Sequence, residues 1–164
     1  MSEYLSAHNR VSGTGDSPDN GESTTDVEAR LRIIFCSLAV LTFVATPIEL
    51  LLLEHTEDLI QLVPFVASFF GLVACGWVLV DPTPARLTGA RWISGSVVLI
   101  AILGSVQHFL HNLELELEIR PNASLWDGAW PALYGAAPFL ATGILILGAL
   151  MVLGATYRHP VYQR

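Results

Sequence analysis

The sequence predicts an all-α integral membrane protein, in which four transmembrane helices form an antiparallel bundle. Composition gives the first two reasons. Hydrophobic residues make up 52% of the 164 residues and charged residues only 14%, whereas a soluble domain carries roughly 25% charged residues. The mean hydropathy is +0.54. The third reason is the pattern, because four apolar segments long enough to cross a bilayer alternate with short polar loops.

The N-terminal segment, 1–28, is polar and rich in Ser, Gly, Asp and Thr. It shows no apolar periodicity, so we predict a disordered cytoplasmic tail. It also lacks the basic start and apolar core of a signal peptide. The transmembrane domain is predicted over 29–157, and residues 158–164 form a second, short cytoplasmic tail.

Four spans are predicted, at about 31–53, 59–80, 92–113 and 130–155. The first has 23 residues and would form a helix of about 34 Å, which exceeds a hydrocarbon core of about 30 Å. Small residues recur within the spans. Gly71, Ala74 and Gly76 in the second span would allow a neighbouring helix to approach closely.

Arginine residues determine the predicted orientation. Four spans place both termini on one side of the membrane, and seven of the eight basic residues lie on that side: Arg10, Arg30, Arg32, Arg86, Arg91, Arg158 and Arg164. The other side holds only Arg120. The positive-inside rule therefore places both termini in the cytoplasm of a cell membrane.

Acidic residues show the opposite bias. On this topology eight of them lie at the external face: Glu49, Glu54, Glu57, Asp58, Glu114, Glu116, Glu118 and Asp127. Together with one arginine they give this face a formal charge of −7, which equals the net charge of the chain. An acidic extracytoplasmic face of this kind attracts cations and repels anions.

The segment 107–118, QHFLHNLELELE, carries the residues best suited to chemistry. Two histidines and a glutamate follow one another at intervals of three residues, so on a continuous helix they share one face. The end of the first span supplies three more groups at the same predicted depth. Imidazole and carboxylate ligands suit zinc, copper or iron. The sequence therefore predicts a transition-metal or proton-relay site formed by His55, His108, His111, Glu49, Glu54 and Glu114.

Simpler interpretations compete with this site. Polar side chains at helix ends can be solvated and reach toward water, and Glu49 facing His108 would form a plain ion pair. Gln107 and Asn112 would then orient that pair or hydrogen-bond across helices. The Leu/Glu alternation at the end of the segment is also typical of a strand. In a strand, Glu114 would leave the face that the histidines share.

The composition also limits the partners. Nucleic acid is not expected, because the chain has no lysine and a net charge of −7. Cys36 and Cys75 lie in apolar segments without a CxxC motif, so we expect them to pack in the core. The expected surroundings are the lipid bilayer and either a partner membrane protein or a second copy of the chain.

Two functions of different class follow from these observations. The first is a non-enzymatic membrane component or accessory subunit, which the small residues on several spans favour because they permit helix packing. The alternative is a metal-dependent membrane enzyme or a metal-handling protein that uses the outer-face His/Glu site.

Overall fold

The computed structural model describes residues 24–54, 56, 59–134 and 139–162, and within them all regular structure is helical. Its elements are α1 (Thr24–Leu52), the 3₁₀ turn η1 (Leu59–Leu62), α2 (Val63–Leu79), α3 (Pro84–Ile119), α4 (Leu125–Leu133), α5 (Phe139–Ala155) and the 3₁₀ turn η2 (Pro160–Tyr162). Helix α1 begins inside the segment 1–28 that the sequence predicts to be a tail; residues 1–23 of that segment lie outside the described residues.

Within the described part of the chain, three helical segments are long and apolar enough to cross a membrane: Asp26–Leu52, Leu59–Leu79 and Pro84–Ile119. They confirm the predicted membrane class and correspond to the first three predicted spans. The fourth predicted span, 130–155, instead contains two helices, because α4 ends at Leu133 and α5 begins at Phe139. The sequence between them carries Gly135 and Pro138, the two residue types least compatible with a helix interior.

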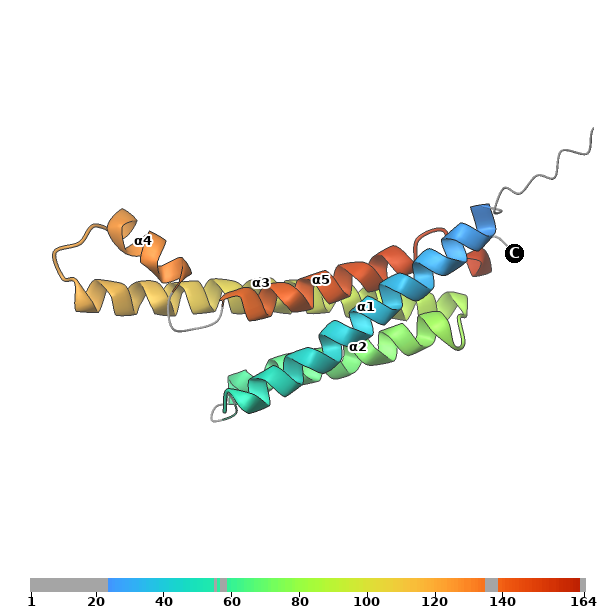
Figure 1. The fold of residues 1–164 in the computed structure, drawn as a ribbon, viewed down its shortest axis with the longest axis horizontal. Coiled ribbons are helices and arrows are strands. Elements are labelled where there is room, and N and C mark those ends of the chain that lie inside the picture. Colours follow the sequence, from blue (N-terminus) through green and yellow to red (C-terminus); the bar gives the residue numbers. More distant parts are fainter. Residues whose placement is uncertain (1–23, 55, 57–58, 135–138, 163–164) are drawn as a thin grey trace, which may run out of the picture.

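The helices pack as a ring of four. Helix α1 contacts α2 and α5, and α3 contacts the same two helices, so α1 and α3 occupy opposite corners. Figure 1 shows the α1–α2 hairpin crossing the α3–α5 pair at an angle, with the start of α1 and the chain's C-terminal end at one end of the molecule. The far part of α3 and the short helix α4 project beyond the α1–α2 connection.

The centre of the bundle is built from small residues around one ring, Phe43 of α1, which is 1% exposed. A Cβ atom added at Gly71 of α2 would lie 2.5 Å from this ring, and one added at Gly148 of α5 would lie 3.3 Å from it. Glycine at these positions therefore permits the close approach of three helices. At Gly76, by contrast, nothing lies within 4 Å of the added atom. Cys36 and Cys75 are buried in the core and unbridged, as expected.

Helix α3 begins at a capped turn, in which the Thr83 side chain accepts a hydrogen bond from the Arg86 N–H at 3.2 Å. Its 36 residues give a length of about 54 Å. The helix continues through Glu114 and the two following glutamates, so the Leu/Glu alternation is helical and not a strand. Leu and Glu both have high helix propensity, and an ion pair between Glu116 and Arg120 supports the last turn.

Candidate functional site

His108, the central residue of the predicted site, lies half-buried on α3 and lines a cavity of about 210 Å³. The other walls come from η1, the start of α2, and the first turns of α5. Gln61, Gln107 and Thr142 supply the remaining polar groups, whereas the rest of the lining is apolar or glycine. Thr142 also shares a hydrogen bond with the Ser105 hydroxyl of α3. The cavity thus places polar groups from three helical segments around His108.

His111 and Glu114 occupy a different position from His108. Both are exposed on α3, where they line a shallow surface hollow together with Gln107. The continuous helix gives the spacing that the sequence analysis required for a shared face. His108, however, lines the cavity, and only Leu103 and Gln107 among the described residues line both the cavity and the surface hollow.

The other two acidic residues of the predicted site, Glu49 and Glu54, lie at the end of α1. Glu49 is exposed on a helix that packs against α2 and α5 and occupies the corner opposite α3. Glu54 follows the helix with a φ of 54°, the left-handed conformation that commonly terminates helices. Its backbone N–H donates to the Leu51 carbonyl at 3.2 Å.

The remaining histidine of the site, His55, lies outside the described residues. Among the residues that are described, no three His, Cys, Asp or Glu side chains form a group that could hold a metal ion. Because His55 is not among the described residues, the six-residue metal site stays a prediction.

Asn112 has the cross-helix role expected of it. Its side chain is 1% exposed and its Nδ2 donates a hydrogen bond of 3.0 Å to the Ala132 carbonyl of α4. Close packing accompanies this bond, because a Cβ atom at Gly128 would lie 3.1 Å from Leu113. The bond and the packing hold α4 against the projecting end of α3.

Helix α4 also has a strong N-terminal cap. The Ser124 side chain accepts from the Asp127 N–H at 3.3 Å, while the Ser124 N–H donates to the Asp127 carboxylate at 3.1 Å. The Ser124 hydroxyl donates to the same carboxylate oxygen at 2.7 Å. These donors favour the charged carboxylate and lower the pKa of Asp127 below its ordinary value.

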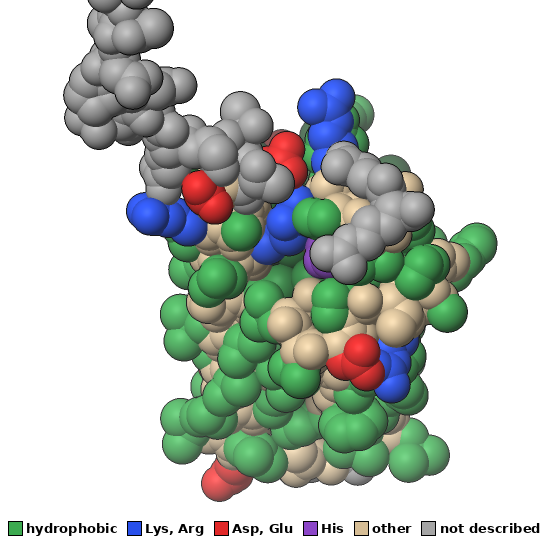
Figure 2. All heavy atoms as spheres, turned by 90° about the vertical axis from the view of Figure 1, so that its right-hand side faces the viewer, with side chains coloured by type: hydrophobic (Ala, Val, Ile, Leu, Met, Phe, Trp, Pro, Cys, Tyr) green, Lys and Arg blue, Asp and Glu red, His purple; other side chains and the backbone are tan. Residues whose placement is uncertain are grey.

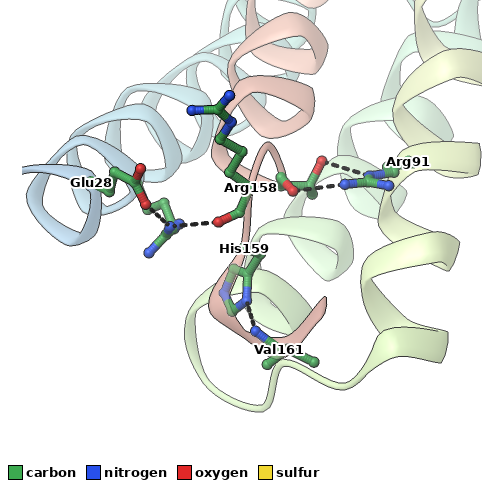
Figure 3. Close-up of polar contacts among 7 residues, drawn as sticks. Glu28, Arg91, Arg158, His159 and Val161 are labelled. Atoms are coloured by element: carbon green, nitrogen blue, oxygen red, sulfur yellow. Dashed lines mark hydrogen bonds and ion pairs between the residues drawn. The ribbon is translucent and has the colours of Figure 1, made fainter. Parts of the chain in front are cut away.

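The opposite end of the bundle carries a polar network that the sequence analysis did not predict. Arg91 of α3 donates from Nε to the Thr156 hydroxyl at 3.0 Å and from Nη2 to the Thr156 carbonyl at 2.8 Å (Figure 3). Its guanidinium also lies 4.8 Å from the ring centroid of Tyr162, a distance suited to a cation–π contact. Arg91 therefore fastens the end of α5 and the following turn to α3.

A second arginine joins α1 to the same C-terminal segment. Arg32 Nη2 lies 3.1 Å from the Glu28 carboxylate and donates to the Arg158 carbonyl at 3.2 Å (Figure 3). Next to it, the buried His159 accepts through Nδ1 from the Val161 N–H at 3.3 Å. Burial first, and the positive charge of Arg32 second, lower the pKa of His159 below 6.5.

Seen from this end, arginine and acidic side chains gather mainly toward the upper part of the face, while hydrophobic side chains occupy much of the rest (Figure 2). No protein-family description, curated protein or solved structure matches this chain.

Proposed function

We propose that the protein crosses the cell membrane four times, through α1, the η1–α2 segment, α3 and α5, with both termini in the cytoplasm. The distribution of arginine supports this topology. Arg32, Arg91 and Arg158 lie at the end of the bundle where α1 begins and α5 ends, and the positive-inside rule assigns such an end to the cytoplasm. Helix α5 has 17 residues, or about 26 Å, which is close to the hydrocarbon thickness of about 30 Å.

Within the membrane, we propose that the chain acts as a non-enzymatic component that binds a partner membrane protein. The observation that carries this proposal is the projecting unit formed by α4 and the far part of α3 (Figure 1). It displays large aromatic side chains, with Trp126 at 87%, Tyr134 at 75% and Trp130 at 66% exposure. Exposed tryptophan and tyrosine are enriched where one protein binds another.

Photocrosslinking tests this proposal directly. A benzophenone amino acid replaces Trp130 in the full-length protein, and a second variant carries it at Leu79, which is exposed on α2 at the other end of the bundle. We expect one discrete protein adduct from position 130 in native membranes and none from position 79. The adduct should disappear when Trp126→Ser removes the neighbouring ring. Lipid adducts alone at both positions would contradict the proposal.

The outer-face metal or proton site is a second candidate function. The observation that favours it is the continuity of α3, which brings His111 and Glu114 to one exposed hollow near Gln107. Metal content per chain, measured by mass spectrometry on untagged protein, tests it. About one bound zinc, copper or iron ion, lost in His108→Ala/His111→Ala, would support the site. Absence of any bound ion from folded wild-type protein would contradict the proposed metal site.

A further inference from the structure

The cavity beside His108 is lined by both apolar and uncharged polar side chains, and this combination indicates the chemistry of a ligand. Ile60, Ile100 and Leu145 are among the apolar residues of its lining. The polar side chains are two amides, an imidazole and a hydroxyl, and no carboxylate or guanidinium occurs among the described lining residues. Apolar pockets with a few placed polar groups are the usual form of small-molecule sites. A neutral ligand with hydrogen-bonding oxygen atoms matches this lining better than a charged head group.

The size of the cavity limits how much of a ligand it can hold. Its volume of about 210 Å³ exceeds the roughly 150 Å³ that accommodates a benzene molecule in an engineered cavity. It falls below the roughly 300–1,000 Å³ of pockets that enclose a drug-sized ligand. One substituted six-membered ring therefore fits, and the rest of a larger molecule must lie elsewhere.

A place for an apolar tail adjoins the cavity. A groove of about 620 Å³ runs between α2 and α3, and Val63 and Ile100 line both it and the cavity. The groove is lined almost entirely by hydrophobic side chains, including Phe70 and Trp92. A molecule dissolved in the bilayer could thus place its ring near His108 and its tail along the α2–α3 face.

We propose that this cavity binds the ring of a quinone-like lipid, through hydrogen bonds to its oxygen atoms, with the alkyl tail in the α2–α3 groove. Imidazole and amide N–H groups donate to carbonyl oxygens, whereas the single proton of the Thr142 hydroxyl is engaged with Ser105, whose own proton goes to the Ala101 carbonyl. The inference concerns binding only. It rests on the membrane location of the three long apolar helices and is independent of the proposed protein partner.

Native mass spectrometry of the full-length protein tests the inference, with decylubiquinone as the probe. We expect saturable binding of one molecule per chain. His108→Leu removes a polar group of the cavity. It should raise the apparent Kd for decylubiquinone at least about tenfold, which corresponds to the loss of one hydrogen bond to the ligand. His111→Leu is the matched control, because this exposed histidine lies outside the cavity lining. It should leave the Kd within about twofold.

A second pair of variants keeps the test valid if His108→Leu does not fold. Gly104 lines the cavity, and a Cβ atom added there meets only Thr142 Cγ2, at 3.5 Å, so Gly104→Ala narrows the cavity without a clash. Gly143→Ala on α5 is the control, since nothing lies within 4 Å of its added atom. We expect weaker binding only for Gly104→Ala.

A competition arm separates recognition of the ring from recognition of the tail. Decanol has an alkyl tail and a hydroxyl but no ring, and in excess it should not displace decylubiquinone. Displacement by decanol would overturn the quinone assignment, as would a lack of saturable binding. The assignment would also be overturned if both variants of a pair weakened decylubiquinone binding equally, because binding would then not depend on the cavity.

Discussion

The contact between Phe43 and Gly71 gives the sharpest prediction about stability. In Gly71→Ala, the added methyl group would lie 2.5–2.6 Å from three atoms of the Phe43 ring. The ring has little room to withdraw, because Gly148 of α5 approaches it from another helix and the ring is 1% exposed. Overpacking of a buried site costs about 1–3 kcal/mol.

Helix propensity opposes this cost. Alanine is favoured over glycine in a helix interior by about 1 kcal/mol. The two effects together predict that Gly71→Ala lowers the free energy of unfolding by up to about 2 kcal/mol. Gly76→Ala on the same helix provides the matched control, because its added methyl group enters open space. It should leave the stability unchanged or raise it by up to about 1 kcal/mol.

The assay is reversible unfolding of the full-length protein in mixed detergent–lipid micelles, followed by circular dichroism as SDS is added. A double-mutant cycle with Phe43→Leu isolates the contact, because the smaller side chain relieves the clash with the new methyl group. We expect the cost of Gly71→Ala to be smaller in the Phe43→Leu background than in the wild type. A Gly71→Ala protein as stable as Gly76→Ala would refute the packing described here.

Three further predictions concern other parts of the molecule. The neutral form of His159 is favoured by folding, so its contribution to stability is complete above the unfolded pKa of about 6.5 and is lost as pH falls toward the lowered pKa of the folded state; the protection factors of the backbone amides within 158–162, which are corrected for the intrinsic exchange rate, should therefore fall in acid, and His159→Gln should remove this pH dependence. Glu54→Gly should raise the free energy of unfolding by about 0.5–1 kcal/mol in the SDS titration, because glycine adopts the left-handed conformation of this position without steric cost; an unchanged or lower value would contradict the assigned helix end. Asn112→Leu should cost about 1–3 kcal/mol, because it leaves the Ala132 carbonyl without its side-chain donor, and tryptophan fluorescence should report the release of α4; an unaltered emission spectrum would contradict its docking.

Hydropathy detects apolar segments that can cross a membrane. For the first two spans it therefore predicts where the helices end. The predicted limits 31–53 and 59–80 end within one residue of the described helices at Leu52 and Leu79. In α3 the helix extends beyond the apolar segment 92–113 at both ends, because its polar flanks retain helix propensity and caps. Hydropathy also hides the break between α4 and α5, since the residues around it are themselves apolar.

The candidate site could be predicted only in part, because its partners come from distant segments. His108 is recognisable as an ionisable residue in an apolar segment. Its neighbours in the cavity, Gln61 and Thr142, are single polar residues that acquire meaning only when η1 and α5 pack beside α3. The same holds for Arg91 and Thr156, which are 65 positions apart in the chain and hydrogen-bonded in the fold. Periodicity detects faces of one helix and carries no signal for such pairings.

Cysteine labelling of intact cells tests the proposed four-span topology. In a Cys36→Ser/Cys75→Ser background, single cysteines replace three exposed residues: Ala85 near the start of α3, Asn122 between α3 and α4, and Tyr157 after α5. We predict that a membrane-impermeant maleimide labels position 122 at once and positions 85 and 157 only after the membrane is permeabilised. Labelling of both positions 122 and 157 in intact cells would show that α5 does not cross, and protection of position 122 with labelling of positions 85 and 157 would show the reverse orientation.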